Sequence, residues 1–122
     1  CQSLVELLDL YPTLSSMCGL EVPSRLQGKN ISPVFDNSKH QVRDAAFSVN
    51  GKGFLLREHD WAYIQYGKSG SKGEELFDMK KDPLQYTNLA KNPNHAETVT
   101  RFRKKMRGKL AEVRSNDLGL KY

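Results

Sequence analysis

Cysteine is scarce in this chain, and long apolar runs are missing from it. The 122 residues hold only two cysteines, Cys1 and Cys18. Their spacing matches no metal or redox motif, and we expect free thiols rather than a disulfide. No apolar run approaches the roughly 20 residues that a membrane-spanning helix needs. The sequence therefore predicts no membrane partner.

Motifs that would mark a catalytic or metal site in the chain itself are missing too. The three histidines, His40, His59 and His95, show no His-x-His or His-x-x-x-His spacing, which a metal site would favour. There is no Gly-x-Ser-x-Gly elbow, phosphate-binding loop or dinucleotide fingerprint. The residues alone thus indicate neither a catalytic residue nor a metal ligand.

The composition that is present is that of an ordinary folded domain. Hydrophobic residues make up 38% and charged residues 27% of the chain, so disorder is not expected. The sequence begins with Cys1 rather than Met. We expect an internal cut or a mature fragment, from which no compartment can be inferred.

Positive charge is concentrated in one segment. The net charge is +5, and seven Lys and Arg residues against two Glu lie between His95 and Arg114. A solvated helix face is the simpler interpretation. A docking surface for acidic polysaccharide or for another domain is the alternative. Aromatic RNA-binding motifs and zinc-finger spacing do not accompany the charge, so no nucleic-acid partner is expected.

The first part of the chain predicts a strand and a helix. Residues 4–8 are an apolar run suited to a buried strand. Asp9 is a good N-cap for a helix that tolerates Pro12 in its first turn and ends at Gly19. Residues 21–39 show no sustained periodicity and predict a linker that crosses the surface.

From Asp44 onward the period of the apolar residues changes to two, which predicts a sheet. The expected strands are residues 46–49, 54–57, 61–66 and 75–78. Asn50-Gly51 between the first two predicts a tight hairpin with positive φ at both positions. The third strand places Trp61, Tyr63 and Gln65 on one face.

The last element is predicted to be a long helix. Asn94 follows Pro93 as a candidate N-cap, and Glu97 stands at the matching capping-box position. Apolar residues at spacings of three and four form one stripe: Val99, Phe102, Met106, Leu110 and Val113. Such a stripe covers one face of a sheet. The fold class is therefore α+β, a small four-stranded antiparallel sheet packed against a long C-terminal helix.

Residues 75–90, with the pattern E-L-F-D-x-x-x-D-P-x-Q-x-x-N-L-A, resemble the closing motif of the sulfatases of the alkaline-phosphatase superfamily. Three further blocks resemble the same family in the same order: residues 5–23, 26–30 and 57–64. Asp82-Pro83-Leu84-Gln85 followed by Asn88 resembles the iduronate-2-sulfatase branch, as does Val5-Glu6-Leu7.

This resemblance implies a division of the chain and an activity of its parent. Residues 1–32 would be the end of the large catalytic α/β domain, with a strand, a helix and a linker, and residues 33–122 the C-terminal subdomain. The parent would hydrolyse sulfate esters, including those of sulfated glycans, with a formylglycine nucleophile and one calcium ion. Both groups would lie outside this chain, which alone would be inactive. The family implies a secreted, periplasmic or lysosomal parent.

One segment looks like the nucleophile signature of sulfatases but does not match it. Val22-Pro23-Ser24-Arg25 resembles the end of Cys-x-Pro-Ser-Arg, yet Glu21 stands at the cysteine position. No catalytic residue is carried over.

The expected partners are the N-terminal catalytic domain and a sulfated polysaccharide. Arg57, His59 and Trp61 are the candidates for the edge of the substrate cleft. A solvated turn histidine is the simpler interpretation of His59. A non-catalytic binding module that uses the basic helix and this edge is the alternative function.

Overall fold

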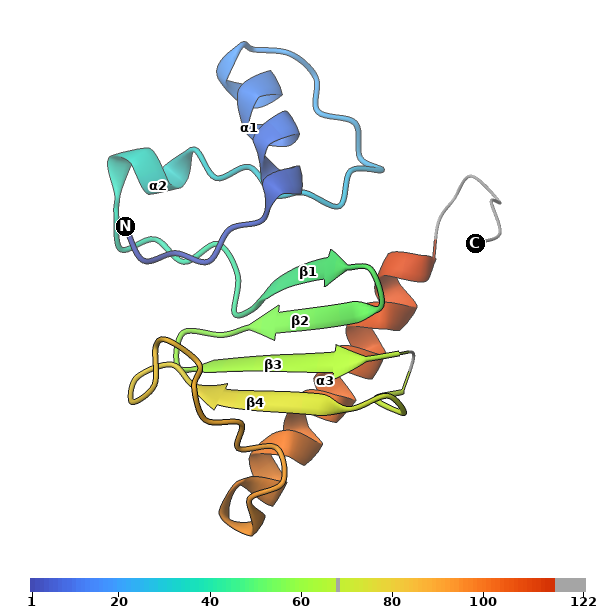
Figure 1. Ribbon diagram of the computed structural model, residues 1–122. Coiled ribbons are helices and arrows are strands. Elements are labelled where there is room, and N and C mark those ends of the chain that lie inside the picture. The colour runs from blue at the N-terminus through green and yellow to red at the C-terminus, as the bar shows by residue number, and fades with distance from the viewer. Residues whose placement is uncertain (68, 116–122) are drawn as a thin grey trace. The chain divides into compact units, whose positions relative to one another are not determined.

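The computed structural model describes residues 1–67 and 69–115. The chain divides into two compact units, Cys1–Ala46 and Phe47–Tyr122. The first contains a 3-10 helix (Leu7–Asp9), α1 (Leu10–Met17) and α2 (Pro33–Asp36). The second is built around β1 (Ala46–Asn50), β2 (Gly53–Arg57), β3 (Trp61–Tyr66), β4 (Glu74–Asp78), a 3-10 helix (Pro93–His95) and α3 (Ala96–Arg114) (Figure 1). No helix among the described residues has the length and apolarity to span a membrane.

The strand predicted for residues 4–8 is wrong, because a 3-10 helix begins at Leu7. The cause is Asp9, which is fully buried and accepts a hydrogen bond from the Glu6 amide at 2.7 Å. That bond closes a turn where an extended strand was expected. Asp9 occupies the N-cap position of α1 but makes no capping bond to it. Its other carboxylate oxygen accepts from the Lys29 amide at 2.8 Å and from the Arg43 side chain.

The segment predicted as a plain linker is partly ordered against α1. Thr13 Oγ1 accepts a hydrogen bond from the Ile31 amide at 3.0 Å, and Pro33 stands in the first turn of α2, where its missing N–H costs nothing. Gly28 is required by close approach, since an added Cβ would lie 2.1 Å from the Leu8 carbonyl oxygen. The helix exit at Gly19, with φ +67°, is confirmed. Cys1 and Cys18 are exposed free thiols, as expected.

The four-stranded antiparallel sheet is confirmed, with strands in the order β1-β2-β3-β4. Leu56 faces Tyr63, and Tyr63 faces Leu76, so these three side chains share one face. The hairpin turn differs from the prediction by one position. Asn50 ends β1, and Gly51 with φ +58° is the first central residue of the turn. Only one of the two central residues then needs positive φ, as in a type II′ turn.

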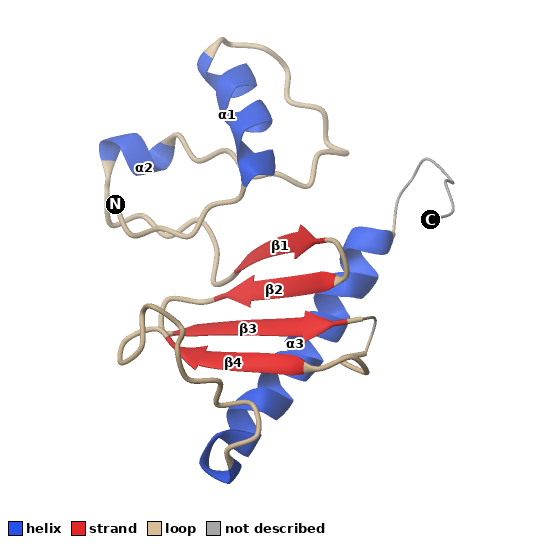
Figure 2. Cartoon of the chain, viewed as in Figure 1, coloured by secondary structure: helices blue, strands red, loops and turns tan. Residues whose placement is uncertain are grey.

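The helix α3 covers the face of the sheet that carries Tyr63 (Figure 2). Tyr63 and Phe102 stack with ring centroids 5.4 Å apart. The predicted stripe is confirmed, because four of its members are at most 3% exposed, namely Val99, Phe102, Met106 and Leu110. Val113 is half-buried. Burial of this stripe against the sheet is the main hydrophobic contribution to the second unit.

The predicted cap of α3 is wrong, because His95 stands at its N-cap position and makes no side-chain capping bond. Asn92, not Asn94, accepts the capping hydrogen bond, from the Asn94 amide at 3.0 Å. The bond caps the 3-10 helix Pro93–His95, which leads directly into α3. Pro93 then occupies the first helical position, where proline is favoured.

Candidate functional site

The family-like motif at residues 75–90 consists of most of β4 and the loop that follows it. This loop returns to form hydrogen bonds along the edge of β4. Asn88 Oδ1 accepts hydrogen bonds from the Leu76 amide at 3.1 Å and the Ala90 amide at 2.9 Å, and Asn88 Nδ2 donates to the Glu74 carbonyl at 3.2 Å. The Leu89 amide donates to the Leu76 carbonyl at 2.8 Å. Asn88 therefore satisfies backbone groups that an edge strand would otherwise leave open.

The Asp82-Pro83 part of the motif holds the tip of the same loop. Asp82 accepts hydrogen bonds from the Tyr86 amide at 3.1 Å and the Thr87 amide at 2.7 Å. Within the turn that these bonds close, Gln85 has φ +60°, the only positive φ of a non-glycine residue in the described ranges. The motif residues thus have a structural role in shaping this loop, and the loop presents Leu84 and Tyr86, which are 70% and 82% exposed.

Of the three cleft candidates, Arg57 is committed to the turn that follows it. Its guanidinium Nη1 donates to the carbonyl oxygens of His59 at 2.9 Å and Trp61 at 3.3 Å, and also to that of Glu58. Arg57 faces Ala62 across β2 and β3, so it lies on the sheet face opposite Trp61. The side chain braces the Glu58–Trp61 turn.

The other two candidates meet Arg57 through their backbone carbonyls. Trp61 makes an edge contact with the ring of His95, with centroids 5.6 Å apart. This contact joins the start of β3 to the start of α3. His59 is exposed in the turn. The structure therefore brings Arg57 to the backbone of His59 and Trp61, while the ring of Trp61 contacts His95 beside the helix. Contact of the three with substrate stays a prediction.

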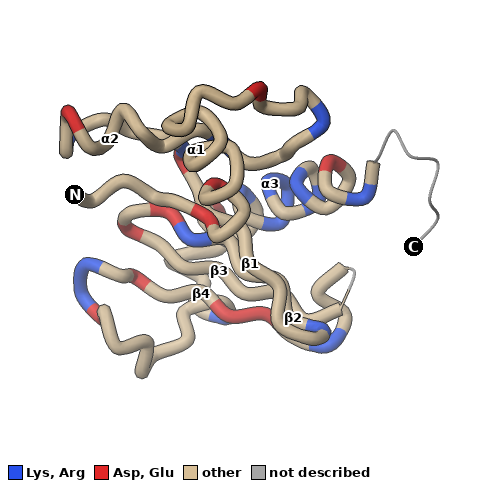
Figure 3. The backbone as a smooth tube through the Cα atoms, turned by 90° about the horizontal axis from the view of Figure 1, so that it is seen from above, with Lys and Arg blue, Asp and Glu red and all other residues tan. Residues whose placement is uncertain are grey.

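The basic residues of α3 are not simply solvated, because four of them form ion pairs. Glu58 forms ion pairs with Arg101 at 2.9 Å and with Lys105 at 2.7 Å. Arg103 pairs with Glu74, and Lys109 pairs with Glu112 at 2.8 Å. Figure 3 shows Lys and Arg recurring along α3. The pairs with Glu58 and Glu74 fix the helix to the two ends of the sheet.

Glu74 is the centre of a small network at the start of β4. Its carboxylate accepts from Arg103 Nε at 3.0 Å and from the Tyr63 hydroxyl at 2.8 Å. The hydrogen bond from Arg103 lowers the pKa of Glu74, against the raising effect of burial. Burial and the nearby Glu74 raise the pKa of Tyr63. At neutral pH the carboxylate is therefore charged and the phenol is protonated.

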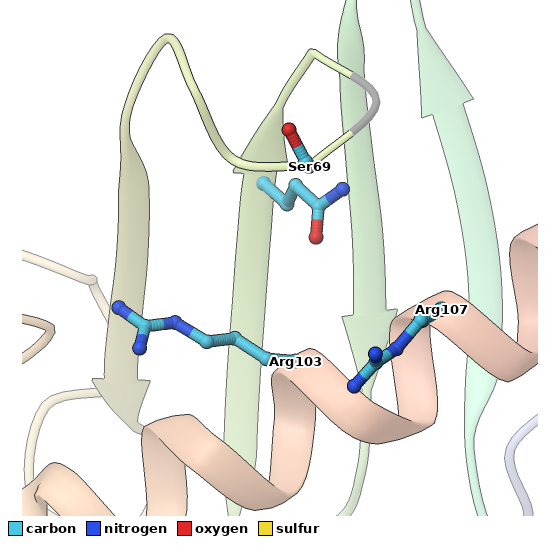
Figure 4. Close-up of a pocket in the computed structure, with 4 residues that line it drawn as sticks. Ser69, Arg103 and Arg107 are labelled. Atoms are coloured by element: carbon cyan, nitrogen blue, oxygen red, sulfur yellow. The ribbon is translucent and has the colours of Figure 1, made fainter.

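A pocket opens beside this network, between α3 and the loop that follows β3. It has a volume of about 270 Å³ and is lined by Gln65, Ser69, Arg103 and Arg107. Figure 4 shows both arginines on α3 and Ser69 on the loop across from them. Gln65 is only 4% exposed, and its Nε2 donates to the Gly67 carbonyl at 3.1 Å. The described part of the lining therefore consists of two cations and two neutral polar side chains.

Sequence reasoning missed this arrangement. Glu58 and Glu74 carried no motif, and their partners on α3 lie 29 to 47 positions away. The alternation of β3 placed Gln65 on the same face as Tyr63, and a polar residue on a core face was the available signal. Among residues 1–67 and 69–115, no three His, Cys, Asp or Glu side chains are arranged to hold a metal ion.

Comparisons with known proteins identify the class of protein that has this arrangement of sheet and helix. A solved structure titled a 2-O GAG sulfatase superimposes with a TM-score of 0.72 and 28% identity, covering 93% of this chain and 26% of that one. Human arylsulfatase K is 30% identical over 101 residues, 72% of this chain and 19% of its own length. The Δ4,5-hexuronate-2-O-sulfatase of Bacteroides thetaiotaomicron is 32% identical over 106 residues, 79% of this chain and 21% of its own.

The architecture is thus that of a sulfatase C-terminal domain. Residues 1–114 match the model of the N-sulphoglucosamine sulphohydrolase C-terminal family, and the chain belongs to that family. The sulfatase resemblance of the sequence is therefore confirmed. The chain spans about a fifth of the length of these curated relatives.

Proposed function

We propose that the complete protein carrying this chain hydrolyses sulfate esters of sulfated glycans, and that these residues are its C-terminal domain. The observation that carries the proposal is the family match over residues 1–114. The relatives named for an activity are sulfatases. The loop at residues 75–90 supports it further, because the hydrogen bonds of Asp82 and Asn88 give the family-like motif a defined shape.

For the substrate we propose a 2-O-sulfated hexuronate within a glycosaminoglycan. One relative is named for 2-O-sulfated hexuronate, at 32% identity. A structural neighbour at 28% identity is titled a 2-O GAG sulfatase. This agrees with the resemblance of residues 82–88 to the iduronate-2-sulfatase branch. Arg57, His59 and Trp61 would border the cleft, with Arg57 holding the turn in place through its carbonyl contacts.

The nucleophile and the calcium ion are proposed to lie in the rest of the protein. Glu21 stands where the cysteine of the sulfatase signature would be, and a carboxylate side chain does not provide the aldehyde. The chain alone would therefore be inactive. By the same family reasoning, the complete protein would act outside the cell, in a periplasm or in a lysosome.

The partner proposed for the first unit is the catalytic domain of the same protein. This unit exposes many large apolar side chains; those at least 59% exposed are Leu7, Tyr11, Leu14, Met17, Leu20 and Phe35. A soluble domain rarely leaves so many apolar side chains in one segment uncovered. Because the relatives are about five times longer than this chain, their remaining residues are the natural cover.

The test compares the complete protein with the 122-residue chain. Both are incubated with an unsaturated disaccharide that carries one 2-O-sulfo group, and with matched N-sulfo and 6-O-sulfo disaccharides. Released sulfate is measured by ion chromatography. We expect release by the complete protein from the 2-O-sulfo substrate and none by the chain alone. Release from only the N-sulfo or 6-O-sulfo substrate would refute the assigned position, and no release from any would refute the activity.

A further inference from the structure

The pocket beside Glu74 contains two arginines, of which only Arg103 has an ion-pair partner among the described residues. Arg103 and Arg107 are four residues apart, so they project from the same side of α3. Arg103 is held by Glu74 through Nε and Nη2. Arg107 has neither an ion pair nor a hydrogen bond within residues 1–67 and 69–115. The lining therefore offers one guanidinium whose five donors are available.

Among the described residues that line the pocket there is no carboxylate. Glu74 neutralises Arg103 from its edge, and Arg107 leaves the site with positive charge. Ser69 adds a hydroxyl that can donate or accept. A planar guanidinium binds the oxygens of a sulfo or phospho group in pairs, which a solvated lysine does not do. The chemistry of the lining thus favours an oxyanion that offers paired oxygens, and a sulfo group is one such anion.

We propose that the pocket lined by Gln65, Ser69, Arg103 and Arg107 binds a sulfo group of a glycan chain. The identity of the ligand rests on the proposed function, whereas its oxyanion character rests on the pocket. A volume of about 270 Å³ lies just below the range of roughly 300–1,000 Å³ typical of small-molecule pockets. It fits one sulfated sugar unit, with the polymer continuing along α3.

A site of this kind would hold a long glycan chain on the protein. Each sulfo group bound here raises the local concentration of its neighbours along the same chain. Lys104 is exposed on α3 and has no ion-pair partner among the described residues. It adds to the general positive field but does not line the pocket. Comparing Arg107 with Lys104 therefore distinguishes binding in the pocket from general attraction of the glycan to the positive charge of α3.

The experiment measures the affinity of the complete protein for a size-defined heparin oligosaccharide by calorimetry. Arg107→Gln removes the available guanidinium, and Lys104→Gln is the matched control with the same change in charge on the same helix. Arg107→Lys keeps the charge but removes the planar donor pair. We expect Arg107→Gln to weaken binding roughly tenfold, the scale of one charge-assisted contact. Arg107→Lys should lose less, and Lys104→Gln little.

Equal losses for Arg107→Gln and Lys104→Gln would overturn the proposal in favour of a diffuse field. Unchanged affinity in Arg107→Gln would overturn it outright. Glucosamine 6-sulfate and glucosamine 6-phosphate are then compared as competitors of the oligosaccharide. Stronger competition by the phosphate ester would overturn the assignment to sulfo groups. Sulfate release from the disaccharide by the unaltered protein tests the proposed function separately, so failure of one does not imply failure of the other.

Discussion

Tyr63 and Phe102 are stacked with their ring planes 17° apart and their centroids 5.4 Å apart. Both rings are fully buried. One comes from the central strand β3 and the other from the middle of α3. Offset or parallel stacking of this kind adds to the hydrophobic gain of burial. The pair is therefore the centre of the contact between helix and sheet.

Replacing Phe102 by alanine is expected to destabilise the second unit by about 3–5 kcal/mol, the usual cost of a large-to-small change in a core. Chemical denaturation followed by circular dichroism measures the loss. Lys104→Ala, two positions along the helix and exposed, should change stability by no more than about 0.5 kcal/mol. Similar losses in both variants would contradict the assigned buried face.

The sheet and the buried face of α3 could be predicted because their signals are local. Alternation with period two marks β3, and spacings of three and four mark the stripe from Val99 to Leu110. The turn at Asn50-Gly51 was predicted in place but shifted by one residue. Glycine supplies the positive φ at Gly51, while Asn50 pairs as the last residue of β1.

What could not be predicted depends on residues far apart in the sequence. Residues 4–8 were predicted as a strand, but Asp9 closes a turn there by accepting from the Glu6 amide. Asp9 is held in place by Lys29 and Arg43, which lie 20 and 34 positions away. The basic face of α3 was predicted to be solvated, because the sequence did not indicate that Glu58 and Glu74 lie beside it. Arg57 and Trp61 were both predicted to border the cleft, but Arg57 faces Ala62 across the sheet and so lies on the face opposite Trp61.

Asn88→Ala should destabilise the loop at residues 75–90. The change removes the acceptor of the Leu76 amide and the donor to the Glu74 carbonyl. An unsatisfied buried backbone group costs about 1–3 kcal/mol. Hydrogen exchange should become faster at the Leu76 and Ala90 amides. Thr87→Ala is the control, because only the backbone amide of Thr87 is used, by Asp82; faster exchange at Leu76 in that variant would argue against the role of Asn88.

Asp9→Asn should loosen the first unit and leave the second one intact. Asp9 is fully buried and binds Arg43, which also pairs with Glu6 at 2.5 Å. Removing one charge from a buried cluster costs about 3–5 kcal/mol, because its partner is left uncompensated.

Hydrogen exchange read by mass spectrometry distinguishes the two units in this variant. Protection should fall across α1 and persist in α3. Asp36→Asn, at an exposed position in α2, serves as the control and should leave the exchange of α1 unchanged. Loss of protection in both units of Asp9→Asn would show that they do not unfold separately.

Acid should destabilise the second unit through Glu74. The hydrogen bond from Arg103 holds the pKa of Glu74 below its ordinary value of 4.5, although burial opposes this. A carboxyl group with a lowered pKa in the folded state contributes stability that is fully present above the unfolded value. That contribution is lost as the pH falls through the lower, folded-state pKa. Stability should therefore decrease on acidification below about pH 4.5.

Glu74→Gln isolates this effect, because glutamine keeps an oxygen for the Tyr63 hydroxyl but carries no charge for Arg103. We expect the variant to be less stable than the unaltered chain at pH 7, with the difference shrinking as the pH falls below 4.5. Burial raises the pKa of Glu58, but the hydrogen bonds and charges of Arg101 and Lys105 together hold it below its ordinary value. Some acid dependence should therefore persist in Glu74→Gln. Glu21→Gln, at an exposed position, is the control. A stability difference for Glu74→Gln that stays constant from pH 7 to pH 3 would mean that the charge of Glu74 does not stabilise the fold.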